Sequence, residues 1–344
     1  MRLAGLLSIF AAGFAPLALA CGFHGYTPQE TAVERMLASY HIVLARPSED
    51  DRFRFKAVEA LEGGLENVDI PYLVDSASRR RLAANPDDAV LFAREGSDGE
   101  WRRLAYVDAE YRALIDKVVA RLPDWELSDD ADRYQMFADL HDHPDRDIRT
   151  LALLELDRAD YGILRALEIR PDAKALRAGL DDLSEMYLAP IRVLLIGLSG
   201  DADARGLLAG GVKRTSVIGT PVLGAYATAW LELDGAEAAR ALADGYLKTP
   251  TTPPKARELI VEAMAIHRLS GDEATRNAIG AELKAAVAEA PHLAPAVARQ
   301  FGLRSVWSLR DALAEALARN AIRSAADLIA VSRYISLASD GDTN

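Results

Sequence analysis

Hydrophobic and polar residues follow two different periods along this chain, and the change falls near residue 125. Before it, short apolar runs and alternation, as in Phe53, Phe55 and Ala57 separated by basic residues, are typical of strands. Five strands are predicted here, at 40–45, 53–57, 68–74, 89–93 and 101–107, with helices at 29–38 and 108–121 on either side. These elements fit either a small five-stranded barrel or an α+β sheet.

Beyond residue 131 apolar residues recur with helical spacing, and three segments align on one template. Each has a glycine, one or two acidic residues and an arginine five positions after the glycine; they span 200–205, 235–240 and 271–276. Apolar residues stand twelve, five and two positions before each glycine, which places them on one helix face. We therefore predict units of helix, tight turn and helix, in which the glycines end the first helices in a left-handed conformation.

Two flanking parts are predicted to be helical without the glycine template. Residues 131–168 form two or three of these helices, and 281–289, 292–301, 306–319 and 322–337 form four more. Terminal units that cap an array are usually atypical. The predicted organisation is a signal peptide at 1–20, a barrel or α+β domain at 21–125, a helical array at 126–337 and a disordered tail at 338–344.

The loop at 143–149 reads His-Pro-Asp-Arg-Asp-Ile-Arg and is followed by Leu151, Ala152 and Leu153. This stretch resembles the loop and second-helix start of a HEAT repeat, with Ile148 where that family usually has valine. The likeness is clearest over 131–157, extends more loosely over 187–280 and fades after about residue 285. It implies an α-α superhelix that acts as a scaffold and binding surface and carries no catalytic residues.

The earlier part has Cys21, the apolar run 41–45, the alternating segment 53–63 and a late apolar segment 88–93. Together they resemble a netrin-like, metalloproteinase-inhibitor type of OB barrel found in some exported bacterial proteins. In those inhibitors the amine and carbonyl of the N-terminal cysteine grip the zinc of the target. The chain departs from the family because Cys21 is its only cysteine, so a disulfide framework cannot form.

Residues 1–20 are predicted to be a cleaved export signal, since Arg2 precedes an apolar run and small residues precede Cys21. The segment 17–21 also resembles a lipoprotein box, with Ala18 where leucine is favoured. Two alternatives therefore stay open for Cys21. It carries lipid and holds the chain at the outer membrane, or it is a free N-terminal cysteine in the periplasm.

The formal net charge of −12 disfavours nucleic acid and anionic lipid surfaces as partners. The only basic cluster, at 79–81, is interpreted as a solvated surface. Contact with a membrane is thus expected only through lipid on Cys21.

His141 and His143, with Asp139 and Asp145 beside them, form the densest group of metal-ligand side chains. Because they fall in the HEAT-like loop, where polar residues are expected anyway, a structural role is the competing interpretation. Cys21 and His24 form the other metal candidate, through thiolate, imidazole and a free amine.

Taken together, these patterns favour a non-enzymatic, exported scaffold that binds a protein partner through its helical surface, with no cofactor. One alternative is a metal-handling protein that uses Cys21 and His24, or His141 and His143. The other is a protease-inhibitor-like module, which the barrel resemblance alone suggests.

Overall fold

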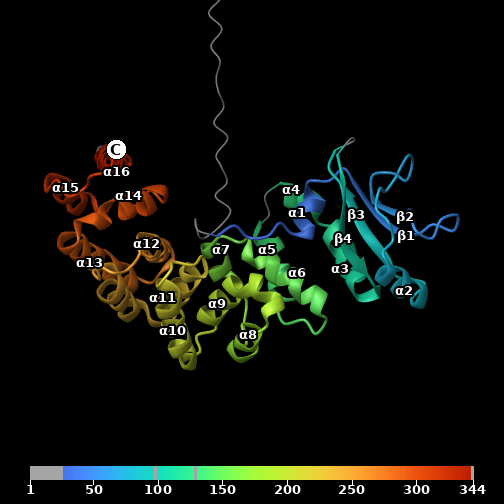
Figure 1. The fold of residues 1–344 in the computed structure, drawn as a ribbon, viewed down its shortest axis with the longest axis horizontal. Helices are drawn as coiled ribbons and strands as arrows, with labels where there is room; N and C mark the ends of the chain where they lie inside the picture. The colour runs from blue at the N-terminus through green and yellow to red at the C-terminus, as the bar shows by residue number, and fades with distance from the viewer. Residues whose placement is uncertain (1–25, 97–98, 128–129, 342–344) are drawn as a thin grey trace, which may run out of the picture.

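A computed structural model describes residues 26–96, 99–127 and 130–341 of the chain. A small sheet lies at one end of a curved, elongated molecule, and the helices that follow it run to the other end in a helical array (Figure 1). The chain is thus mostly helical, with an α+β region first. The predicted signal peptide, Cys21 and His24 lie outside the described residues.

The sheet has four strands, β1 (His41–Pro47), β2 (Phe55–Glu62), β3 (Ala89–Arg94) and β4 (Trp101–Val107), in the order β2-β1-β3-β4. All neighbouring strands are antiparallel. Three helices accompany it, namely α1 (Ala32–Leu37), α2 (Ser76–Ala84) and α3 (Ala109–Val119). The helices expected on either side of the strands are therefore present, together with α2, which was not foreseen.

The prediction of a closed five-stranded barrel is wrong, because the segment 68–74 is not a strand. It forms only an isolated bridge between Leu73 and Arg54. Pro71 has no N–H to donate to a ladder, which disfavours a strand here. Ile70 and Val74 are nevertheless buried, because the segment lies over the sheet as coil and contributes its apolar side chains to the core.

Each face of the sheet has its own core. Val43, Val90 and Phe92 point to one face, where Ile70 and Leu82, the latter from α2, cover them. Alternate residues of the same strands point to the other face and pack against α1 and α3. That second core also contains apolar residues of the first helices of the array, so the sheet and the array share it.

The array begins at residue 122 and consists mainly of α-helices. They are α4 (Leu122–Glu126), α5 (Asp130–Ala138), α6 (Arg146–Asp157), α7 (Tyr161–Ala166), α8 (Ala173–Gly179), α9 (Ala189–Leu198), α10 (Arg205–Ser216), α11 (Val222–Leu242), α12 (Pro254–Ser270), α13 (Glu273–Glu289), α14 (Ala294–Leu303), α15 (Arg310–Ala318) and α16 (Ala325–Gly341). Short η segments join some of them, at Leu183–Leu188, Ala202–Ala204, Ala243–Leu247 and Pro291–Leu293. Helix α16 extends four residues into the segment expected to be a disordered tail.

From α9 onward the helices pack in chain order in two rows. One row is α9, the first part of α11, α12, α14 and α16, and the other is α10, the second part of α11, α13 and α15. Helix α11 belongs to both rows because its backbone turns at Gly235, where φ is 51°. One continuous apolar core runs between the rows.

Glycine stands at the three template positions for two different structural reasons. Gly200 and Gly235 adopt positive φ, as predicted. Gly271 does not, since its φ is −71°. A side chain there would place its Cβ 2.6 Å from the carbonyl oxygen of His267, so close backbone approach, and not left-handed geometry, accounts for this glycine.

Two of the three apolar columns upstream of the glycines lie in the core. Leu188, Leu223 and Leu259, twelve positions before, are buried, and so are most of the residues five positions before. In the column two positions before, Leu198 and Leu233 are partly buried against the core, and Leu269 is 57% exposed. Among the described residues, no helix has the length and apolarity needed to cross a membrane.

Candidate binding surface

The loop between α5 and α6 separates its two histidines. His141 is buried, with Nδ1 2.7 Å from the carbonyl oxygen of Ala138. His143 accepts a hydrogen bond from the backbone N–H of Asp145 at 3.1 Å, and its Nε2 lies 3.5 Å from Glu110 of α3. The two imidazoles therefore have different partners.

The other acidic residues of this loop are already engaged. Asp145 caps α6 by accepting from the N–H of Ile148 at 2.9 Å, and Asp139 accepts from Gln135 at 3.0 Å. Among residues 26–96, 99–127 and 130–341, no three His, Cys, Asp or Glu side chains gather in a way that could hold a metal ion. The loop geometry is that of a helix cap.

His143 lines a cleft of about 520 Å³ between α3, α5 and α6, where the sheet region meets the array. Glu110, Lys117, Arg121 and Asp139 also line it, so charges of both signs face this space. Apolar residues such as Met136 and Ile148 also line it. The mixture of charges gives the cleft no clear preference for one kind of ligand.

The most connected polar cluster lies deeper, around Glu232 of α11. Tyr161 donates to its carboxylate at 2.8 Å, Arg165 at 2.9 Å, and His267 of α12 lies at 3.3 Å. Burial raises the pKa of Glu232, but the hydrogen bonds from His267, Arg165 and Tyr161 outweigh it and lower the pKa to about 2. His267 is 1% exposed, out of reach of a substrate, so the cluster ties α7, α11 and α12 together.

A different cleft, of about 500 Å³, lies between α14 and α16 near the C-terminal end of the array. Most of its lining is apolar or aromatic. Leu303, Trp307, Tyr334 and Leu337 contribute the largest side chains, and Gly302 lets the aromatic rings come close to α14. The rings of Trp307 and Tyr334 pack edge to face with centroids 5.1 Å apart.

Hydrogen bonds within the chain hold this cleft in shape. The Tyr334 hydroxyl donates to the carbonyl of Val306 at 2.5 Å and accepts from the N–H of Leu309. Arg299 of α14 pairs with Glu258 of α12 and with Asp327 of α16, each at 2.7 Å. Three neighbouring helices are thus fixed around the cleft by contacts within the chain.

One charged side chain in the cleft, that of Arg333, takes no part in these stabilising contacts. Arg333 of α16 is exposed, lines the cleft and has no hydrogen-bond or ion-pair partner among the described residues. Leu303 and Leu337 beside it are 48% and 40% exposed. The cleft therefore offers apolar contact together with a single free guanidinium group.

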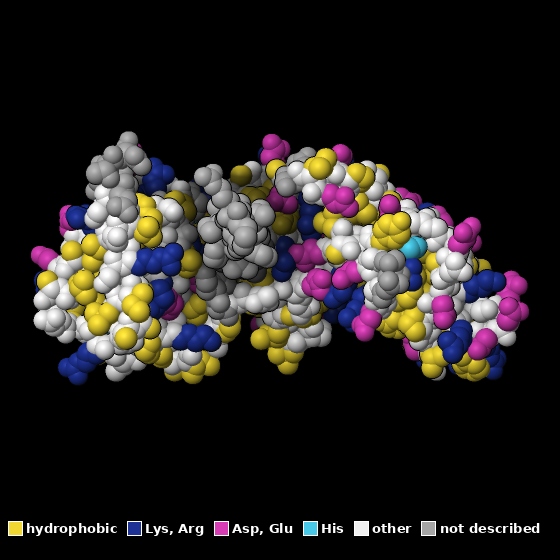
Figure 2. Space-filling model, turned by 90° about the horizontal axis from the view of Figure 1, so that it is seen from above, with side chains coloured by type: hydrophobic (Ala, Val, Ile, Leu, Met, Phe, Trp, Pro, Cys, Tyr) yellow, Lys and Arg dark blue, Asp and Glu magenta, His cyan; other side chains and the backbone are white. Residues whose placement is uncertain are grey.

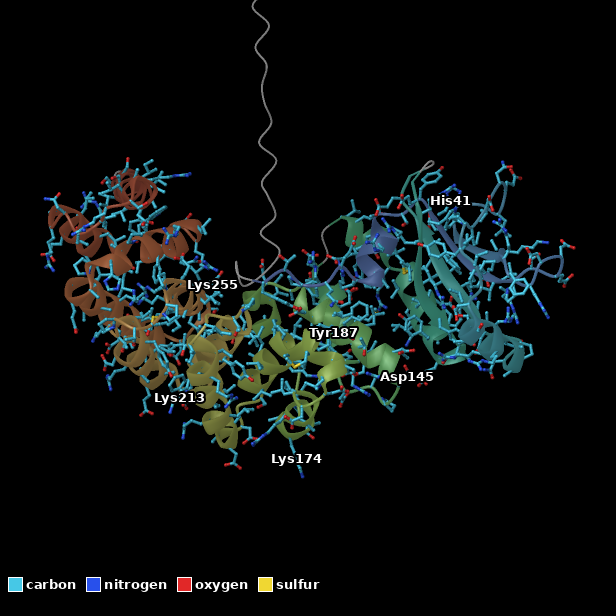
Figure 3. All side chains as sticks on the ribbon, viewed as in Figure 1. His41, Asp145, Lys174, Tyr187, Lys213 and Lys255 are labelled. Carbon is cyan, nitrogen blue, oxygen red and sulfur yellow. The ribbon has the colours of Figure 1, made fainter. Side chains whose placement is uncertain are left out.

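On the face seen from above, charged and hydrophobic side chains are distributed unevenly along the molecule, although Lys and Arg are present at both ends (Figure 2). Seen from above, hydrophobic side chains lie among Lys and Arg over the C-terminal helices, whereas acidic side chains are frequent over the middle and the sheet end (Figure 2). Lys174 and Lys213 lie on the opposite, lower edge of the array, far from α16 (Figure 3).

No protein-family model, no curated protein and no solved structure matches this chain.

Sequence reasoning did not find the cleft between α14 and α16. Its residues come from α12, α14, α16 and the turn at Trp307, and no short motif connects them. A signal was present, because α16 carries Ile329 and Leu337 at positions that face outward and has few charges. Two large apolar residues at outward positions of the last helix could have pointed to this end of the array.

Proposed function

We propose that this protein is an exported, non-enzymatic scaffold that binds a protein partner through the surface of its helical array. The proposal includes two finer expectations, an α-α superhelix of HEAT-like repeats and an exported location with Cys21 either lipidated or free. In support, the helices from α9 onward stack in chain order in two rows, as repeat units do when each buries its apolar face against its neighbour.

The HEAT-like expectation gains support from the loop at 143–149. Asp145 caps α6, and Arg149 of that helix folds back to donate to the carbonyl of His143 at 2.6 Å. Two of the three template arginines reach the next unit, whereas Arg276 donates to the carbonyl of Gly271 in its own turn. Arg205 pairs with Asp234 at 2.8 Å and Arg240 lies 3.5 Å from Glu282.

The observation that carries the function is the preformed apolar cleft between α14 and α16. Exposed apolar patches bordered by polar groups are typical of protein interaction sites. The side chains that hold the cleft open already have partners within the chain, so its exposed leucines are free to contact another protein.

Affinity capture with the full, matured chain tests this function. The tagged chain is expected to retain one stoichiometric protein from the cell-envelope fraction through a wash at moderate salt. An unrelated exported protein with the same tag and a similar net charge is the control. Capture of nothing beyond the proteins that the control retains would contradict the scaffold function.

A further inference from the structure

The outward face of the last helix of the array carries two large apolar side chains among polar ones, since Ser332, Arg333 and Ser336 are exposed beside them. Ile329, Arg333 and Leu337 follow one another at intervals of four residues on α16 and therefore share one face. Ile329 is 68% exposed and Leu337 40%. A terminal repeat usually turns a polar face to solvent, because it has no further neighbour to cover it.

The shape of the cleft favours a helix as its occupant. Its walls are two neighbouring helices of one row, α14 and α16, which pack against each other and leave an elongated groove lined by both. An amphipathic helix that places an apolar stripe into such a groove is a recurrent mode of peptide recognition.

The unpaired charge in the cleft indicates which charge a partner side chain should carry. Arg333 is free of partners among the described residues, whereas Arg299 on the opposite wall is already neutralised by Glu258 and Asp327. A guanidinium group binds a carboxylate through two parallel hydrogen bonds, which gives both energy and orientation. An anionic group beside apolar side chains would therefore complement the cleft.

A second copy of this chain fits the cleft less well. In a two-fold symmetric dimer each surface meets its own copy, so the two unpaired Arg333 side chains would enter one interface. Like charges that come together there oppose association. The charge argument therefore favours a different chain.

We propose that the cleft between α14 and α16 binds an amphipathic α-helix of a partner protein, with leucine-like side chains between Leu303 and Leu337 and a carboxylate on Arg333. This inference rests on the proposed scaffold function and names the segment that the scaffold recognises.

Two synthetic peptides of about 18 residues, long enough to form helix in water, test the inference with the full mature chain. Both consist of alanine and glutamine with leucines at every third or fourth position. One has a glutamate on the leucine face, and the other has lysine there. Fluorescence anisotropy of the labelled peptides is expected to show about tenfold tighter binding of the glutamate peptide, as an ion pair replaces a like-charge contact.

Charge reversal supplies the decisive variant. Arg333→Glu is expected to reverse the preference, so that the lysine peptide binds more tightly. Lys213→Glu is the matched control, because it makes the same charge change at an exposed site on the opposite edge of the array and should leave the preference intact (Figure 3). Leu337→Asp should weaken both peptides, and circular dichroism verifies that each variant is folded.

The inference is overturned if neither peptide binds the wild-type chain, if both bind equally, or if the preference survives Arg333→Glu. These results are separable from those of the capture experiment. A partner that is captured equally well by the wild type and by Arg333→Glu leaves the scaffold function standing and removes the cleft as its site. If the two peptides show the expected preference but no partner is captured, the scaffold function is contradicted instead.

Discussion

The two ends of the helical array differ in how their terminal helices are covered. At the first end, the sheet and α3 cover α5 and α6, and residues such as Phe137, Leu151 and Ala152 lie in one core with the strands. At the last end, α16 leaves Ile329 and Leu337 facing outward. Both ends belong to stacked helices, which have apolar sides to bury.

Polar contacts also stabilise the first end of the array, which we call the closed end because the sheet and α3 cover it. The segment before the sheet reaches back to α6, where Tyr26 donates to Asp157 at 2.6 Å and Glu34 of α1 pairs with Arg158 at 2.6 Å. Inside the same junction Arg133 pairs with Glu155, whose side chain is fully buried. The first end is thus covered and stabilised within the chain, whereas the last end exposes part of its apolar surface.

The largest expected effect is at the apolar core of the closed end. Phe137→Ala removes a fully buried ring that packs beside Trp125, with ring centroids 6.3 Å apart. It should lower the free energy of unfolding by about 3–5 kcal/mol, since a cavity is left between the sheet and the array. Denaturant titration followed by circular dichroism measures this.

The last end of the array, where α16 has outward apolar side chains, is called the open end. Leu337→Ala at this end is the control for that prediction. It also removes a large apolar side chain, but one that is already 40% exposed, and should cost less than about 1 kcal/mol. Equal losses in the two variants would show that the ends do not differ in packing.

The next effect in size concerns the buried ion pair at the junction. Arg133→Met leaves the carboxylate of Glu155 without its cation, and burial already raises the pKa of that group. The expected loss is about 3 kcal/mol, typical of removing one partner of a buried pair.

Adding Glu155→Leu to Arg133→Met should recover much of that loss, because no buried charge then remains. Arg146→Met offers a comparison at an exposed pair, since the Arg146 side chain is 60% exposed beside Glu185, and its effect should be much smaller. Thermal unfolding of the four chains compares them directly. A double variant no more stable than Arg133→Met would contradict the electrostatic explanation.

The helical array was largely predictable because its signal is periodic and local. Apolar columns and a repeated turn identify helices that bury one face, and Leu188, Leu223 and Leu259 lie in the core as expected. In the column closest to each glycine, only Leu269 was misjudged, because Leu198 and Leu233 pack partly buried against the core. Leu269 has the right spacing for the core, but it lies in the last turn before the connection and faces solvent.

The sheet region and the cleft were harder to predict, because both depend on contacts between distant residues. The run 68–74 has the apolar pattern of a strand, yet Pro71 and the position of the segment over the sheet leave it as coil. The cleft joins Glu258, Trp307 and Arg333 from separate elements. No spacing along the chain indicates that these residues lie close together.

A smaller effect should appear as a pH dependence at the closed end. Burial raises the pKa of Asp157 from its ordinary value of 3.8 to about 6, although Tyr26 and Arg158 oppose the rise. Between those values the unfolded chain has lost the proton and the folded chain still holds it, so the free energy of unfolding falls as the pH rises.

Asp157→Asn removes this titration and leaves an acceptor for Tyr26. At pH 7 the variant is expected to be more stable than the wild type by about 2 kcal/mol, and the gap should close as the pH is lowered toward 4. Denaturant titrations at a series of pH values measure the difference. A gap that is independent of pH would exclude Asp157 as the titrating group.

The smallest expected effect belongs to the open end and is the most direct test of the comparison. Ile329→Lys places a charge on the outward face of α16, where Ile329 is 68% exposed, and should change the free energy of unfolding by less than about 0.5 kcal/mol. The same change at Ile148, which is 2% exposed in the junction core, should be strongly destabilising. Chemical denaturation of both variants gives the two values. A loss above about 1 kcal/mol in Ile329→Lys would mean that this face is packed within the folded chain, and the array would then have two closed ends.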